Sequence, residues 1–60
     1  MYKIGDILVQ HGRGWNMTYR VVEKLSHPSG MLYTLQSVKL KHDFIEEVSE
    51  DYLSKNFTKR

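Results

Sequence analysis

The 60-residue chain has no cysteine, one proline and no long apolar run. Without cysteine no disulfide can form, and three histidines alone do not indicate a structural zinc site. No segment approaches the roughly 20 apolar residues that a membrane-spanning helix requires. Residues 1–6 lack the apolar stretch of a signal peptide, and we interpret them as the start of the domain. We therefore expect a cytoplasmic protein without metal, cofactor or membrane contact.

The residues that are present suffice for one small core. A chain of this length forms a single domain, which buries only ~60% of the surface that it exposes when unfolded. Apolar residues make up 40% of the chain and include one Trp, four Tyr and two Phe, which is too many for a disordered protein. We expect the domain to cover residues 1–57 and the basic tail, residues 58–60, to fray.

The charge is distributed unevenly, although the net value is only +2. Residues 1–42 contain six Lys or Arg against two Asp or Glu, whereas residues 43–54 contain five acidic and no basic residues. Residues 55–60 add three basic residues. Such a polarity can orient a charged partner, but solvated segments that happen to be acidic produce the same pattern.

Alternation of apolar and polar residues predicts that most of the chain is β-strand. The predicted strands cover residues 7–10, 17–25, 31–38 and 44–48. In the second of these strands, one face collects the apolar residues that we expect in the core. These residues are Met17, Tyr19, Val21 and Leu25.

Local patterns also predict the connections and one helix. Two glycines in six residues make residues 11–16 a loop, and the sequence Ser-His-Pro-Ser-Gly makes residues 26–30 a tight hairpin turn. Ser49 has the character of a helix N-cap followed by two acidic residues, so we expect one or two helical turns over residues 50–55. Phe57 either begins a short last strand or covers the core.

Two short motifs resemble those of a known fold. The Ile-Gly-Asp-Ile sequence of residues 4–7 is similar to the start of many SH3-like barrels, including those of the KOW type, and residues 48–53 resemble the helical turn before their last strand. This resemblance implies an all-β, SH3-like barrel of four to five short antiparallel strands with one helical turn near residues 50–55. The opening and the tryptophan doublet of peptide-binding SH3 domains are absent, so polyproline recognition is not implied.

Groups suited to catalysis are scattered along the chain. His11, His27 and His42 lie in three separate loops of the expected fold, and no pair has the helical spacing of a metal site. Carboxylates cluster in residues 43–51, but adjacent ones on a strand point to opposite faces. Because no nucleophile–base pair or buried acid–base pair is indicated, we predict that the protein is not an enzyme.

Residues 11–16 form the predicted binding loop. Arg13 lies between two glycines, and Trp15, the only tryptophan, lies where the loop meets the second strand. Tryptophan and arginine are enriched among the residues that dominate binding energy at protein interfaces. We therefore predict a partner-binding site of Arg13, Trp15, Tyr19 and Arg20. The alternative is that Trp15 only covers one end of the core.

The sequence leaves three functions open. The first is a protein-binding adaptor or inhibitor. A resemblance to the small accessory proteins of tailed bacteriophages, in length and expected fold, implies that it is phage-encoded and acts on a host protein in the host cytoplasm. The second is a nucleic-acid-binding barrel, because basic and aromatic side chains together bind single strands; its residues are Arg13, Trp15, Arg20, Lys39 and Lys41. The third is a structural subunit, and the sequence does not decide between a monomer and a homo-oligomer.

Overall fold

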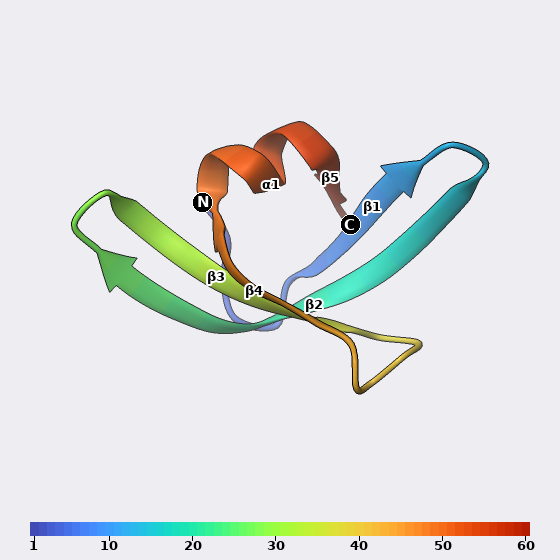
Figure 1. The fold of residues 1–60 in the computed structure, drawn as a ribbon, viewed down its shortest axis with the longest axis horizontal. Helices are drawn as coiled ribbons and strands as arrows, with labels where there is room; N and C mark the ends of the chain where they lie inside the picture. Colours follow the sequence, from blue (N-terminus) through green and yellow to red (C-terminus); the bar gives the residue numbers. More distant parts are fainter.

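The computed structural model describes residues 1–60 and contains five strands and one helix (Figure 1). In chain order these are β1 (Ile7–Gly12), β2 (Trp15–His27), β3 (Gly30–Ser37), β4 (Phe44–Ser49), α1 (Glu50–Asn56) and β5 (Phe57–Lys59). All strands belong to one antiparallel sheet with the order β4-β3-β2-β1-β5. The predicted all-β domain with one short helix is therefore confirmed. The hairpin predicted at residues 26–30 is also present, but its turn is shorter than predicted, because His27 pairs with Gly30 and only Pro28 and Ser29 lie between the strands.

The sheet is not closed. β4 and β5 lie at its two edges and pair only with β3 and with β1, respectively. The sheet is instead strongly bent, and α1 lies on its concave side, between the two hairpin arms (Figure 1). We call the opposite side of the sheet the convex face. The strand pairing therefore does not confirm a barrel.

The hairpin between β1 and β2 is tighter than the sequence indicates. Gly12 pairs with Trp15, which leaves only Arg13 and Gly14 in the turn. Gly14 has a φ of 69°, a left-handed conformation that such short turns use and that glycine adopts without strain. The expected loop over residues 11–16 is wrong in extent, because two residues suffice to reverse the chain.

β2 contains a β-bulge at Val22, where its register against β3 shifts by one residue. An extra residue moves every later side chain of the strand to the other face of the sheet. Leu25, which we expected in the core, is therefore 54% exposed. Lys24 takes the concave side instead, and its Nζ lies 5.9 Å from the ring centre of Tyr33. The prediction for Leu25 was wrong because it assumed uninterrupted alternation.

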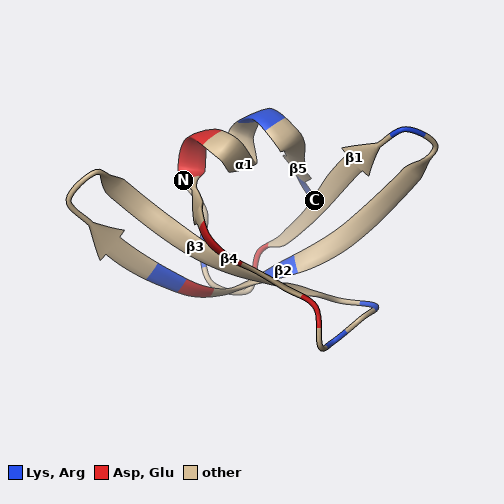
Figure 2. Ribbon diagram, in the orientation of Figure 1, with Lys and Arg blue, Asp and Glu red and all other residues tan.

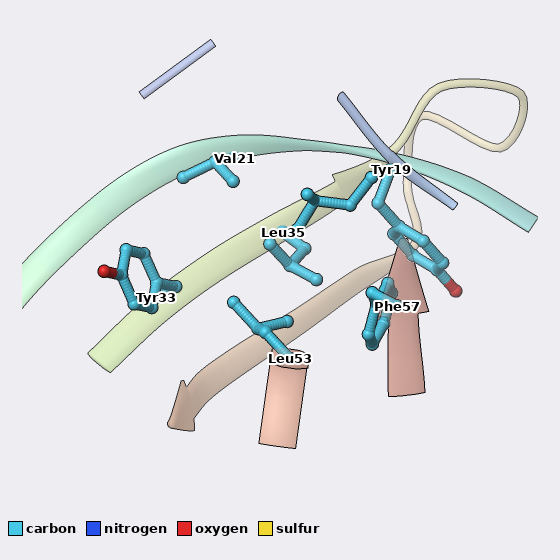
Figure 3. Packing of buried hydrophobic residues seen from close by; sticks show 7 residues of the cluster. Tyr19, Val21, Tyr33, Leu35, Leu53 and Phe57 are labelled. Carbon is cyan, nitrogen blue, oxygen red and sulfur yellow. The ribbon is translucent and has the colours of Figure 1, made fainter. Parts of the chain in front are cut away.

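The core lies on the concave side of the sheet, under α1 (Figure 3). Its seven buried apolar residues come from every element except β4, and they are Leu8, Tyr19, Val21, Tyr33, Leu35, Leu53 and Phe57. Leu53 extends from α1 toward Leu35 of β3 (Figure 3). The rings of Tyr19 and Phe57 meet edge to face with their centres 5.8 Å apart, a favourable aromatic geometry. The core therefore joins both ends of the chain to the central strands.

The start of α1 is fixed by two hydrogen bonds. The Ser49 Oγ accepts a hydrogen bond from the backbone N–H of Tyr52 at 3.1 Å, which confirms the predicted N-cap. The hydroxyl of Tyr33 donates to the carboxylate of Glu50 at 2.8 Å. This bond lowers the pKa of Glu50, whereas burial chiefly raises the pKa of Tyr33. At seven residues α1 is the only helix, and no helix has the length and apolar character needed to cross a membrane.

The C-terminal residues belong to the sheet. β5 pairs with β1 along its whole length, and the N–H of Arg60 donates to the carbonyl of Ile7 at 2.9 Å. The Nζ of Lys59 also lies 3.3 Å from the carboxylate of Asp6. Residues 58–60, which we expected to fray, therefore follow the edge of the sheet.

Candidate functional site

The four residues of the predicted partner-binding site do not share one surface. β2 is regular from Trp15 to Arg20, so these side chains, five positions apart, point to opposite faces of the sheet. Tyr19 lies in the core and is only 6% exposed. Burial, and to a smaller extent the charge of Asp43, raises the pKa of its phenol. Tyr19 is therefore a core residue, and Arg13 with Trp15 must be considered apart from Arg20.

Trp15 lies at the end of the β1–β2 hairpin and is about half exposed (49%). Strand alternation places its side chain on the concave side, two positions from Met17, which packs against the core. Gly12, its partner across the ladder, has no side chain, and the indole occupies the space above it. A Cβ at Gly12 would lie 1.9 Å from the indole Cε2. Gly12 is therefore the surface on which Trp15 packs, and Arg13 is exposed beside it at the tip.

A second exposed ring lies on the same side of the sheet. Tyr52 of α1 is 42% exposed, and its ring centre is 6.2 Å from that of Phe57. Phe57 pairs with the β1 residue two positions before Gly12, about 7 Å away along the strand. Trp15 and Phe57 therefore lie on the concave side, on opposite sides of β1, and Tyr52 lies next to Phe57. We call Trp15 and Tyr52, with Arg13 at the adjoining tip, the concave aromatic site.

Sequence reasoning missed Tyr52. Leu53 is the fully buried residue of α1, and an adjacent helical position lies about 100° away around the helix axis. A capped helix with one buried leucine could therefore have placed Tyr52 at the rim of the core, partly covered and partly in solvent. The sequence pattern contained this information, but we used it only to locate the helix.

A polar pocket of about 370 Å³ lies where the chain leaves β3. It is lined by Arg20, Gln36, Ser37, Val38 and Lys41. The Gln36 Nε2 donates to the carbonyl of Lys41 at 2.9 Å, and the Ser37 Oγ accepts a hydrogen bond from the N–H of Leu40 at 2.9 Å. These bonds hold the loop between β3 and β4 against the sheet. Arg20 and Lys41 are thereby brought together, whereas Lys39 lies in the same loop without lining the pocket.

Basic and acidic residues are concentrated in different parts of the fold. Figure 2 shows basic residues at the tip of the β1–β2 hairpin, within β2 and in the loop between β3 and β4. Acidic residues lie along β4 and at the start of α1 (Figure 2). The predicted nucleic-acid residues Arg20 and Lys41 are therefore close together, while Arg13 and Trp15 lie at the far end of the hairpin.

Two of the three histidines, His11 and His27, contact neighbouring polar side chains. His11 lies between the Thr58 hydroxyl, 2.9 Å from its Nε2, and the Asn16 side-chain oxygen, 3.2 Å from its Nδ1. His27 contacts the Ser29 hydroxyl within its turn at 2.7 Å. No three His, Asp or Glu side chains lie close enough together to hold a metal ion. These contacts link neighbouring strands or close a turn.

Comparison with known proteins gives no family for this chain. No protein-family model, curated protein or solved structure matches it. Its function is therefore inferred from two surfaces, the concave aromatic site and the pocket of Arg20 and Lys41.

Proposed function

We propose that the protein is a protein-binding module that contacts its partner through the concave aromatic site. The observation that carries the proposal is the half-exposed Trp15, packed over Gly12 at a hairpin tip. Trp, Tyr and Arg are the residue types most enriched among those that dominate interface energies. Trp15, Tyr52 and Arg13 supply one residue of each type.

The Trp15 ring of the concave aromatic site is ordered before a partner arrives. The turn contains only two residues, and the indole already packs on β1, so it has little side-chain freedom left to lose. Ordering a free side chain at an interface costs ~0.5–1.5 kcal/mol, and a packed ring avoids much of that cost. The hairpin also extends away from the helix-covered centre (Figure 1), which gives a partner access to the ring.

The strand arrangement supports the further proposal that the domain is SH3-like with an open barrel. β1 pairs with both β2 and β5, and α1 occupies the connection between the two edge strands. β2 is 13 residues long and its bulge at Val22 is the kind of irregularity that bends a strand from one half of a sheet into the other. The resemblance to phage accessory proteins makes a host protein the proposed partner.

Affinity capture from a bacterial lysate tests the protein-binding proposal. Immobilised wild-type protein is compared with Trp15→Ala and Tyr52→Ala, and with Leu25→Ala as a matched control. Leu25 is 54% exposed, close to Trp15 in exposure, but lies on the other hairpin. Circular dichroism establishes that each variant is folded.

We expect one protein species to be retained by the wild type and by Leu25→Ala. Its capture should be lost with Trp15→Ala and weakened with Tyr52→Ala. A capture pattern that is the same for Trp15→Ala as for the wild type contradicts the proposal. Equal losses in Trp15→Ala and Leu25→Ala contradict it as well, because they indicate binding through general apolar exposure.

A further inference from the structure

One half of the convex face carries no acidic side chain. Strand alternation and the cross-strand register place on this half Ile7, Val9, His11, Asn16, Thr18, Arg20, Gln36 and Thr58. The hydrogen bonds of His11 to Asn16 and to Thr58 confirm that these strands present those residues on one side. Arg60 continues the alternation of β5, since its N–H donates to the Ile7 carbonyl. The formal charges that the register places on this half are therefore positive, whereas Asp6, which precedes Ile7, is paired with Lys59, and Asp43 ends the loop that carries Lys41.

The basic side chains at this face are not neutralised within the molecule. Its three ion pairs involve the N-terminal amine of Met1, Lys55 and Lys59. Neither Arg20 nor Lys41 has a carboxylate within ion-pairing distance, although both line the same pocket. Two like charges that share a pocket repel each other. An anion placed between them would convert this repulsion into two attractions.

We propose that this face binds the phosphodiester backbone of single-stranded nucleic acid, with one phosphate in the pocket of Arg20 and Lys41. The arginine guanidinium presents paired donors that match phosphate oxygens, and the lysine adds a point charge. Arg60 follows about 10 Å away across two strand spacings, on the far side of Ile7. It provides a second phosphate contact along the same strand of nucleic acid.

The shape of the face selects a single strand over a duplex. The sheet bends away from a ligand on its convex side (Figure 1). Double-stranded DNA is stiff over ~50 nm, so it would touch a convex surface of this size only at its highest point. A single strand is flexible and can follow the curvature from the pocket to Arg60.

An exposed ring next to the pocket distinguishes nucleic acid from a simple anion. Phe44 is the partner of Gln36 across the ladder and is 50% exposed. A base attached to the phosphate in the pocket can stack on this ring, as bases do on aromatic side chains of single-strand-binding proteins. Phe44 itself lines the neighbouring pocket, together with Glu23 and Glu46. These carboxylates repel a phosphate backbone. We therefore expect the backbone to run from the pocket of Arg20 and Lys41 toward β5, so that the base at this end of the strand is the one that stacks on Phe44.

Fluorescence anisotropy with a labelled oligothymidylate tests the proposal at about 50 and 200 mM salt. The double variant Arg20→Gln/Lys41→Gln is compared with Lys3→Gln/Lys55→Gln, which removes the same charge from exposed positions outside the face. The Lys55 side chain pairs with Asp51 on the helix surface, and such an exposed pair contributes little to stability. The matched control therefore reports on net charge alone.

We expect the wild type to bind at low salt and to weaken steeply as salt increases. Arg20→Gln/Lys41→Gln should lower affinity at least about tenfold at low salt and reduce the logarithmic salt slope by about 0.7, because the one phosphate of the pocket is no longer neutralised. Phe44→Ala should weaken binding several-fold. The control pair and the Trp15→Ala/Tyr52→Ala variant should bind as the wild type does, so the test does not depend on the proposed protein interface.

Four results would overturn the proposal. The first is no binding at low salt, and the second is an equal loss of affinity in the two charge-removing pairs. The third is binding of a duplex as tight as that of the single strand. The fourth is binding of inorganic polyphosphate as tight as that of the oligonucleotide, with no effect of Phe44→Ala on the latter, since this would indicate a general anion site.

Discussion

Gly12→Ala is the substitution that most sharply tests the geometry of the concave aromatic site. A single methyl group is added at an exposed position, where a change of this size ordinarily has little effect. Here the new Cβ would lie 1.9 Å from the Cε2 of Trp15, which is far shorter than any contact between two carbon atoms that are not bonded to each other. The indole must therefore move off Gly12, and we expect it to turn toward solvent.

The expected loss of stability follows from the area that the ring covers. Tryptophan buries 150–250 Å² when it is fully covered, so a ring that is 49% exposed covers roughly 100 Å². At about 25 cal/mol per Å² this contact stabilises the fold by ~2.5 kcal/mol. Replacing a strand glycine by alanine by itself raises the free energy of unfolding by ~0.5–1 kcal/mol, which offsets part of this loss. We expect Gly12→Ala to lower the free energy of unfolding by about 1.5–2 kcal/mol.

Urea unfolding followed by circular dichroism measures this loss, and the emission of Trp15, the only tryptophan, reports where its ring lies. We expect Gly12→Ala to shift the emission to longer wavelength. In a Trp15→Ala background the same substitution should be neutral or slightly stabilising, because there is no ring to displace. Gly14→Asn is the matched control: asparagine tolerates the positive φ, and nothing lies within 4 Å of its Cβ.

The reasoning is refuted if Gly12→Ala has the unfolding free energy and emission of the wild type. It is also refuted if the substitution costs as much without the tryptophan as with it. Either result would mean that the indole does not rest on Gly12, and the proposed ordering of the site before binding would fail with it.

Three further predictions concern the fold. Leu53→Ala, which empties a fully buried position, should cost ~2–5 kcal/mol in thermal or urea unfolding, whereas Leu25→Ala should cost far less, because Leu25 is largely exposed. Ser49→Ala should cost ~1 kcal/mol through the lost N-cap, seen as reduced helical signal and a lower unfolding midpoint. The hydrogen bond from the Lys3 N–H is the main cause that lowers the pKa of Asp6 below its usual 3.8. Asp6 therefore contributes stability that is present above pH 3.8 and is lost as the pH falls through the lower pKa of the folded state. Asp6→Asn should remove this part of the pH dependence, as measured by thermal unfolding at a series of acidic pH values.

The strands and the helix could be predicted because their patterns are local. The alternation in β1 and β3 and the Ser49 cap each act over a few residues, and each was found close to its predicted place. The bulge at Val22 was not predictable in this way. Its residues have ordinary strand character, and the extra residue is set by pairing with β3. A single missed residue was enough to place Leu25 on the wrong face.

The candidate site could be predicted only in part. Trp15 was correctly singled out as the residue at the end of a strand, but the two glycines beside it were taken together as a flexible loop. The structure gives them different roles, since Gly14 adopts the positive φ and Gly12 lies under the indole. Arg20 was grouped with Trp15 because they are near in sequence, and the two-residue period of a strand separates them.

The central claim is that Trp15 is a point of contact with another protein. Site-specific photo-crosslinking tests it most directly, with a photoreactive phenylalanine placed at Trp15 in one variant and at Leu25 in another, since both positions are about half exposed. In a bacterial lysate, we expect the probe at Trp15 to yield a discrete crosslinked protein that the probe at Leu25 does not yield. No discrete product from Trp15, or the same products from both positions, would contradict the claim.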